Sequence, residues 1–347
     1  MRKISYCEAL TEAMSQEMER DSSVFTYGIG VPDHKRIFGS TRGLVEQFGL
    51  ERCFDTPLSE DAMTGFGLGA AINGLRPIHV HARIDFMLLA MNQLTNMMSS
   101  YHYATGGKLR VPMVIRVIIG RGWGQSFQHS KTMHSIFAHI PGIKVVMPTT
   151  PYDVKGMMIE AIRDDNPVVF IEHRWLYYAE DEVPEESYTV PFGVGNVLRR
   201  GSDVTVVATS WMNVEALRAA DVLQKKHGVS VEIVDPRSIL PLDEKFIVDS
   251  VQKTGRCLVA DYDWLHCGFS AEVAARVSKE CFGHLKSPVE RLGFVFAPCP
   301  SARSLENSYY PDSVTIIRKV EAMLDLSHAD ISDQEFFSYE KKFKGPY

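Results

Sequence analysis

Short β-branched runs alternate with amphipathic helical segments along most of the chain, and this alternation constrains the fold more than any other feature of the sequence. In the first half we expect strands at 24–27, 76–81, 111–119, 143–147 and 168–172. After Gly201 the alternation restarts, with expected strands at 204–208, 229–234 and 257–261 and helices at 213–226 and 243–254. This pattern is typical of open parallel sheets covered by helices. We therefore predict an α/β chain with two open parallel-sheet domains.

The composition changes between these two runs. Pro184, Glu185 and Glu186 indicate an exposed stretch, and Gly193 and Gly195 precede the second run. A chain of 347 residues is too long for one ordinary domain and is long enough for two. We expect a first domain at 1–185, a linker at 186–200 and a second domain at 201–347.

Composition and charge exclude several classes of protein. The fractions of 45% hydrophobic and 23% charged residues are those of a globular protein. The net charge of −6 is spread along the chain, and no basic block predicts binding of nucleic acid. The apolar stretch 111–120 is interrupted by Arg116, so we expect no membrane span. No signal peptide is expected before the first helix, which a capping box of Ser5 and Glu8 begins. The six cysteines lack paired spacing, which is typical of reduced thiols in a cytoplasmic protein.

Two polar residues lie where α/β proteins place ligands. Glu60 lies at a loop-to-helix junction, and His129 lies in a glycine-rich loop after the expected strand 111–119. Loops at the carboxyl ends of parallel strands are the usual ligand sites, and a histidine there can carry a proton near neutral pH. Each residue also has a structural interpretation. Glu60 could interact with a helix dipole, and His129 could cap a helix that begins near Lys131.

Two other patterns indicate binding sites only weakly. Gly65, Gly67 and Gly69 lack the spacing of a dinucleotide-binding turn and lie inside the expected helix 60–73, so they indicate close helix packing. His79 and His81 alternate on an expected strand, but no third and fourth ligand follows at a spacing suited to zinc.

Collinear motifs run through almost the whole chain. Asp-Thr-Pro-Leu-Ser-Glu occurs at 55–60, Gly-Leu-Arg-Pro at 74–77, Gln-His-Ser at 128–130 and Pro-Gly-Ile-Lys-Val-Val at 141–146. In the second half, Gly-Ser-Asp-Val-Thr occurs at 201–205 and Val-Asp-Pro-Arg-Ser at 234–238. Together they resemble the β subunits of thiamine diphosphate-dependent pyruvate and branched-chain 2-oxoacid dehydrogenases, within the transketolase-like superfamily. The resemblance implies a first domain that binds the pyrimidine end of the cofactor and a second domain like the C-terminal domain of transketolases.

The resemblance also implies roles for particular residues. Glu60 matches the carboxylate that hydrogen-bonds the pyrimidine ring nitrogen and so promotes activation of the thiazolium carbon. Phe86 and Leu58 match residues at the pyrimidine pocket, and Phe86 is also expected to begin a single helix at 86–103. His129 matches an active-site histidine that stabilises or protonates intermediates. In relatives, the loop that corresponds to Ala161, Asp164 and Asn166 binds a structural potassium ion.

One motif of thiamine diphosphate enzymes is absent from the sequence. Gly-Asp-Gly, which holds the divalent ion on the diphosphate, occurs nowhere in these 347 residues. In the resembling family this motif lies on the α subunit. The resemblance therefore implies an obligatory α subunit that anchors Mg²⁺, an α₂β₂ heterotetramer and a lipoyl-bearing acyltransferase as a further partner.

Several positions depart from the family pattern. Ile29 and Gly30 stand where relatives have two acids, and Ala297 stands where relatives commonly have aspartate. At 80–83, Val-His-Ala-Arg replaces Glu-x-Gln-Phe. If strand alternation continues, His81 and Arg83 share one face, and if both project toward the pocket they add positive potential for the carboxylate or phosphate of a substrate. Arg83 could then bind the carboxylate or phosphate of a substrate, or it could pair with an acid at a subunit interface.

Three functions follow from these observations. The main interpretation is an enzyme component that decarboxylates a 2-oxoacid and passes the acyl group to a lipoyl acceptor. The first alternative is a split transketolase-like or acyloin-forming enzyme that transfers a two-carbon or acyl unit to an aldehyde or sugar. The second is a non-catalytic assembly scaffold, which the presence of both Glu60 and His129 disfavours.

Overall fold

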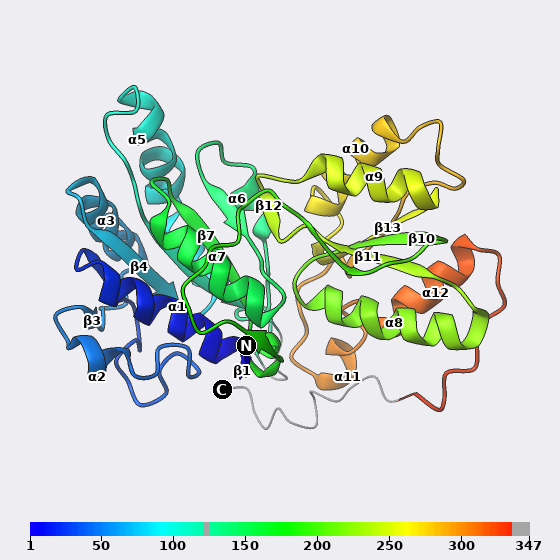
Figure 1. The fold of residues 1–347 in the computed structure, drawn as a ribbon, viewed down its shortest axis with the longest axis horizontal. Helices are drawn as coiled ribbons and strands as arrows, with labels where there is room; N and C mark the ends of the chain where they lie inside the picture. Colours follow the sequence, from blue (N-terminus) through cyan, green and yellow to red (C-terminus); the bar gives the residue numbers. More distant parts are fainter. Residues whose placement is uncertain (121–124, 335–347) are drawn as a thin grey trace. The chain divides into compact units, whose positions relative to one another are not determined.

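A computed structural model describes residues 1–120 and 125–334, which divide into two compact units (Figure 1). The first unit contains residues 1–120 and 136–192, and the second contains the described residues 125–135 and 193–334. Both units are α/β, as the alternation predicts. The change between units at 192–193 falls inside the expected linker. The segment 125–135 clusters with the second unit, although we expected it within the first domain.

The first unit is built on parallel strands in the order β6-β7-β5-β4-β2-β3. Their bounds are β2 (Val24–Tyr27), β3 (Cys53–Phe54), β4 (Arg76–His81), β5 (Val114–Ile119), β6 (Lys144–Val146) and β7 (Val168–His173). The strands β4, β5 and β7 are almost entirely buried and rich in β-branched residues. Such continuous apolar runs are characteristic of parallel strands that are covered on both faces.

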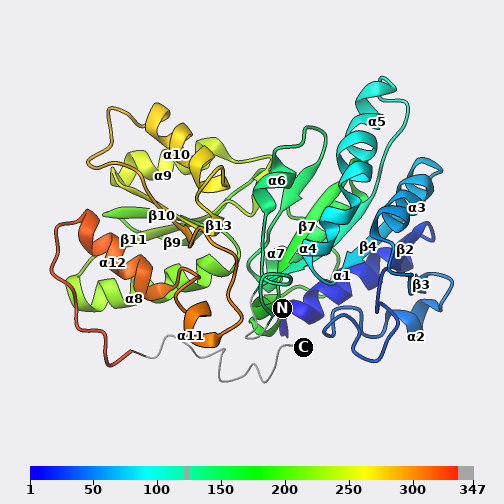
Figure 2. The ribbon, with the colours of Figure 1, turned by 180° about the vertical axis from the view of Figure 1, so that it is seen from behind.

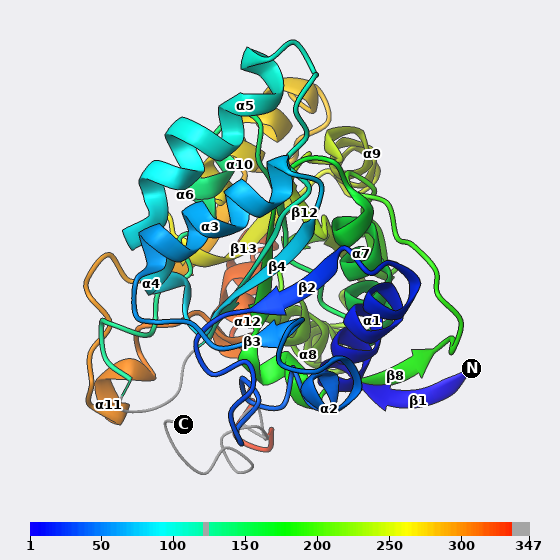
Figure 3. The same cartoon turned by 90° about the vertical axis from the view of Figure 1, so that its left-hand side faces the viewer.

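Helices cover both faces of this sheet. Figure 3 shows α3 and α5 on one side of β2 and β4, and α1 and α7 packed together on the other. The helices of this unit are α1 (Tyr6–Arg20), α2 (Leu44–Phe48), α3 (Glu60–Ile72), α4 (Ile84–Met87), η1 (Leu88–Ala90), η2 (Gln93–Met98), α5 (Ser99–Ala104), α7 (Pro151–Arg163) and η3 (Arg174–Tyr178). Helix α6 (His134–Ala138) has its first two residues in the second unit and the rest in the first.

The helix ends show which local signals were reliable. The capping box of Ser5 and Glu8 is present at α1, and Thr150 caps α7 through the backbone N–H of Asp153. The helix that we expected at 86–103 is present as one continuous helical segment, but it is irregular: it consists of α4, the 3₁₀ turn η1, the π-helical turn η2 and α5. Helical periodicity in the sequence does not reveal such π-helical insertions.

A buried ion pair crosses the first sheet between neighbouring strands. The Arg116 guanidinium on β5 donates to both carboxylate oxygens of Glu172 on β7, at 2.6 and 2.8 Å. Tyr177 Oη donates to the same carboxylate at 2.6 Å, and Ser40 Oγ accepts from Arg116 at 2.9 Å. Burial alone lowers the pKa of Arg116, but Glu172 outweighs it and keeps the guanidinium charged. Because both side chains are fully buried, the pair depends on these hydrogen bonds.

Besides the two-residue strand β3, two short strands of the first unit were not expected. β1 (Arg2–Ser5) pairs antiparallel with β8 (Glu180–Val183), outside the main sheet. Each strand has four residues and is largely exposed, which leaves too little alternation to identify it.

The second unit has its own sheet in the order β14-β13-β10-β11-β9, in which only β9 is antiparallel (Figure 2). Helices α8 and α12 lie on one face, and α9 and α10 lie on the other. The strands of this sheet are β9 (Asn196–Arg199), β10 (Val204–Ala208), β11 (Val231–Asp235), β13 (Cys257–Trp264) and β14 (Glu290–Phe294), and the short strand β12 (Ser238–Leu240) is not part of it. The helices are α8 (Trp211–His227), α9 (Glu244–Thr254), α10 (Phe269–Glu280), α11 (Arg303–Glu306) and α12 (Ser313–Met323). No helix within 1–120 or 125–334 has both the length and the apolar character needed to cross a membrane.

Candidate active site

A cavity of about 410 Å³ opens in the first unit at the carboxyl ends of its strands. Parallel sheets bind ligands at this edge because loops from neighbouring strands meet there. The described lining comes from the loops after β2 and β3, the end of β4 and the starts of α3 and α4. It consists of Ile29, Thr56, Pro57, Leu58, Glu60, Met63, His79, Val80, His81, Ala82, Phe86 and Leu89.

Three residues that the resemblance assigns to the cofactor lie together in this lining. Glu60 is the first residue of α3 and is partly buried. Leu58 is 81% exposed and Phe86 is 37% exposed, which is unusual for large apolar side chains. A flat heteroaromatic ring would cover this apolar surface and bring its polar edge to the carboxylate. The residues therefore fit the pyrimidine ring of thiamine diphosphate.

The glycine string of α3 has a packing role. A Cβ at Gly67 would lie 2.0 Å from Tyr27 Oη and 2.7 Å from Met113 Cε. The close approach lets Tyr27 Oη donate to the carbonyl oxygen of Met63 at 2.9 Å, and Met63 lines the cavity. This contact supports the packing interpretation over a dinucleotide-binding turn.

His79 and His81 project from β4 to the same side and contact each other. Their ring centroids lie 4.2 Å apart, and His79 also stacks on Tyr27 at 4.4 Å with an interplanar angle of 8°. Thr64 Oγ1 lies 3.4 Å from His79 Nδ1. Burial lowers the pKa of both imidazoles, to about 4 for His81. Both rings are therefore neutral at pH 7, and His81 does not add the positive potential that its sequence position suggested.

Arg83 does not share this environment. β4 ends at His81, so the strand alternation that would place Arg83 beside it does not continue. Arg83 is absent from the described lining of the cavity. Its guanidinium donates to the carbonyl oxygen of Gly120 at 3.1 Å and lies 5.7 Å from the ring centre of Phe38. A role for Arg83 in binding substrate stays a prediction.

His129 belongs to the segment 125–135 of the second unit and is partly buried. Two anchors fix this segment within the unit. Tyr310 Oη donates to the carbonyl oxygen of Ser130 at 3.0 Å. Ser135 Oγ donates to Asp263 at 3.2 Å and accepts from the backbone N–H of Phe269 at 2.8 Å.

A third anchor of this segment was missed by the sequence analysis. His134 is fully buried, with Nε2 3.0 Å from Asp261 Oδ1 and Nδ1 3.8 Å from Asp263 Oδ2. Burial alone lowers the pKa of His134, but the Asp261 carboxylate outweighs it and raises the pKa above its ordinary value. The one clue in the sequence is the Asp-x-Asp pattern at the end of β13. Because this pattern lies far from His134 along the chain, the sequence does not connect the two.

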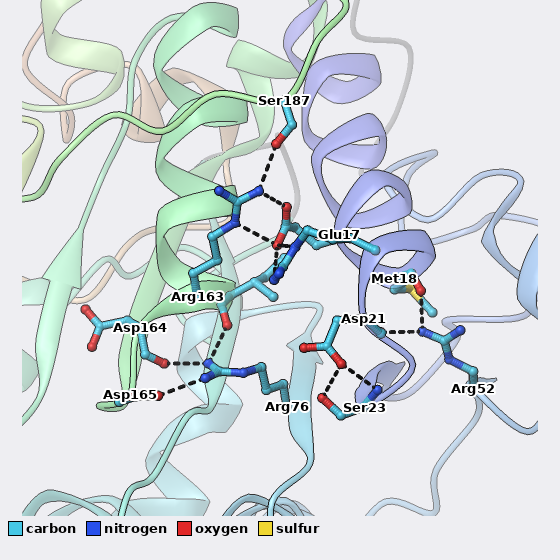
Figure 4. A network of polar contacts seen from close by, with 12 residues as sticks. Glu17, Met18, Asp21, Ser23, Arg52, Arg76, Arg163, Asp164, Asp165 and Ser187 are labelled. Atoms are coloured by element: carbon cyan, nitrogen blue, oxygen red, sulfur yellow. Dashed lines mark hydrogen bonds and ion pairs between the residues drawn. The ribbon is translucent and has the colours of Figure 1, made fainter.

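The loop after α7 is already occupied by cationic side chains (Figure 4). Arg76 donates to the carbonyl oxygens of Ile162 and Asp164, at 2.9 and 3.0 Å, and to Asp165 Oδ1 at 2.8 Å. The Asp164 carboxylate pairs with Lys144, and its Oδ1 accepts from the backbone N–H of Asn166 at 2.9 Å. Ala161 lies buried in the last turn of α7. Two cations at Asp164 make the loop a poor site for a further cation, and no cluster of three metal-binding side chains occurs in 1–120 or 125–334.

Two family models match the chain in the order of its units. The pyrimidine-binding domain of transketolase matches residues 2–179, and the transketolase C-terminal domain matches residues 193–316. The β subunit of acetoin:2,6-dichlorophenolindophenol oxidoreductase from Cupriavidus necator is 42% identical over 91% of this chain and 96% of its own length. The β subunit of the pyruvate dehydrogenase E1 component from Rickettsia bellii is 40% identical, over 92% and 98%. The chain belongs to this family of β subunits.

Two further comparisons agree with this assignment. The β subunit of 2-oxoisovalerate dehydrogenase from Bacillus subtilis is 40% identical over 90% of this chain and 97% of its own length. Among solved structures, a split-gene transketolase described as an inactive β4 tetramer superposes with a TM-score of 0.73, at 20% identity, over 94% of this β subunit and 99% of that chain. At that identity the superposition shows the shared fold. The expected fold class and family are thus confirmed.

Proposed function

We propose that the chain is the β subunit of a thiamine diphosphate-dependent enzyme that takes an acyl group from a 2-oxoacid, with loss of carbon dioxide, and passes it to a lipoyl acceptor. The observation that carries this proposal is the cavity in which Glu60 lies beside exposed Leu58 and Phe86. The family of β subunits supports the same function.

The residues of this chain would act around the pyrimidine ring. When bound, thiamine diphosphate would supply the nucleophilic carbon that this chemistry needs. Phe86 and Leu58 would hold the ring and exclude water, and Glu60 would stabilise a proton on the ring nitrogen. His129 would move a proton to or from the reacting oxygen of the substrate.

The proposal includes a partner. Since the sequence has no Gly-Asp-Gly motif, an α subunit would anchor Mg²⁺ and the diphosphate. We propose an α₂β₂ complex in the cytoplasm, served by a lipoyl-bearing acyltransferase, with active sites between subunits. A potassium ion at Ala161, Asp164 and Asn166 is the weakest part of the proposal, because Arg76 and Lys144 already engage Asp164.

The alternatives gain less support. The likeness to a split-gene transketolase concerns the fold alone, and no described feature favours a sugar acceptor. A scaffold would not need a carboxylate in an apolar cavity. The acetoin relative does favour an acyloin as a second candidate acyl donor, because that protein is named for one.

Substitution of Glu60 tests the proposal. In the co-purified α–β complex, Glu60→Gln should leave the fold intact and lower turnover by several powers of ten, as loss of an essential catalytic carboxylate does. Asp61→Asn is the matched control, because Asp61 is the exposed acid at the next helical position. Steady-state kinetics with 2-oxoacids measures both. Turnover of Glu60→Gln within about tenfold of the unsubstituted complex contradicts the assigned role.

A further inference from the structure

The two histidines of β4 line the cavity together with Thr56, and no family role explains these polar residues. His79 is held by the ring of Tyr27 on one side and by Thr64 Oγ1 at 3.4 Å. His81 packs against His79 and lines the cavity, yet its side chain is only 5% exposed. Its Nε2 atom has no hydrogen-bond partner among residues 1–120 and 125–334.

This unpaired nitrogen requires a partner. A neutral imidazole carries one donor and one acceptor nitrogen, and leaving either buried and unpaired is unfavourable. The charged form is excluded by the surroundings, because burial depresses the pKa of His81 and the titratable group that faces it is another buried histidine. His81 therefore offers a neutral hydrogen bond to an occupant of the cavity.

The rest of the lining limits what that occupant can present. Glu60 is the one charged residue in the described lining, and the majority of the others are apolar. A carboxylate placed here would meet no cation and would be repelled by Glu60. An uncharged carbonyl or hydroxyl oxygen needs no cation and is not repelled by Glu60.

We propose that His81 Nε2 hydrogen-bonds an uncharged carbonyl or hydroxyl oxygen of the acyl donor, bound in the same cavity beside the pyrimidine ring, so that this chain selects the donor by its neutral part. The proposal rests on the function proposed above for the same cavity. It gives His81 a role in substrate specificity that is separate from cofactor binding. Any recognition of a carboxylate would then fall to other parts of the assembled enzyme.

Two substitutions of His81 test this role in the co-purified α–β complex. His81→Phe keeps a ring but removes both nitrogens, whereas His81→Gln places an amide near the position of Nε2. We expect His81→Phe to lower kcat/KM by about tenfold to a hundredfold, the effect of losing one buried hydrogen bond. The factor should be similar for pyruvate and for neutral acetoin, while the dissociation constant of thiamine diphosphate stays within about threefold. His81→Gln should recover at least half of the lost free energy.

The outcomes separate this proposal from the proposed function. His139→Phe, at an exposed histidine of the same unit, controls for substitution of an imidazole and should leave all constants unchanged. A loss confined to pyruvate would mean that His81 recognises the carboxylate, and weakened cofactor binding with unchanged kcat/KM would assign it to the cofactor. Equal losses in His81→Gln and His81→Phe would leave a purely structural role. Each of these overturns the proposal, whereas absence of thiamine-dependent turnover in the unsubstituted complex would overturn the proposed function.

Discussion

Two buried histidines, one in each unit, have pKa values shifted in opposite directions. His81 lies among a histidine and apolar residues, and burial lowers its pKa to about 4. His134 is equally buried, but Asp261 lies 3.0 Å from its Nε2 and raises its pKa. Because the residue type and the burial are the same, the difference arises from the neighbouring carboxylate. Burial alone therefore does not decide whether a histidine binds a ligand as a cation or as a neutral group.

The two environments also suit different tasks. In the first unit a neutral ring keeps the cavity free of fixed positive charge. In the second, the ion pair fixes the segment that carries His129 to the end of β13. An ion pair is appropriate there because the histidine meets its carboxylates only when the segment is correctly placed.

The largest effect that tests this comparison is expected from Asp261→Asn. The substitution leaves a buried histidine without its main counter-charge, which should lower the free energy of unfolding by about 3–5 kcal/mol. Urea unfolding of the purified chain measures the loss, and NMR should show a lower pKa for His134. Asp263→Asn is the matched control, because its carboxylate lies farther from the ring, at 3.8 Å. Equal destabilisation by the two substitutions would contradict the assignment of Asp261 as the main partner.

A change of pH is expected to alter the free energy of unfolding by a smaller amount. Between about pH 4 and 6.5 an unfolded His81 binds a proton that the folded chain excludes, so its contribution to stability rises with pH and is lost as pH falls. The total loss below pH 4 should be roughly 3 kcal/mol. His134 has the opposite sign, since its raised pKa stabilises the fold below about pH 6.5 and the contribution disappears as pH rises through the folded pKa.

Urea midpoints measured across this range check both slopes. His81→Phe should flatten the slope on the acid side and leave the alkaline side unchanged. If His81→Phe retains the full acid slope, the neutral state assigned to His81 is wrong.

The smallest effect should follow from Thr64→Val. This change removes the hydroxyl 3.4 Å from His79 Nδ1 and preserves the shape of the side chain. A long hydrogen bond between neutral groups contributes about 0.5–1 kcal/mol, so the urea midpoint should shift only slightly. A loss as large as that of Asp261→Asn would indicate that the His79–His81 pair carries charge.

The sequence predicted the parts of the structure that depend on local patterns. Helix α3, strand β4 and the cap at Ser5 agree with the structure, because capping and periodicity are properties of neighbouring residues. The strand β1 was missed because its partner β8 lies far along the chain.

The cavity was predicted less completely than the fold. Leu58, Glu60, Phe86 and His81 were named before the structure placed them together in one lining. The charge of His81 could not be predicted, because it depends on burial in three dimensions. Arg83 was expected on the same face, but the strand ends before it. His134 was missed because its acidic partners lie on β13, in a distant part of the sequence.

Segment 125–135 belongs to the second unit although it precedes the rest of that unit in the sequence, and this affects folding during translation and exchange of the unit by gene fusion. The ribosome delivers this segment before any of the strands β9 to β14. Since domains fold as units during synthesis, the segment must wait until Asp261 and Asp263 emerge before His134 finds its counter-charges. A truncation or gene fusion at residue 192 would leave those two carboxylates buried without their cation. The second unit therefore cannot be exchanged between proteins as one continuous stretch of sequence.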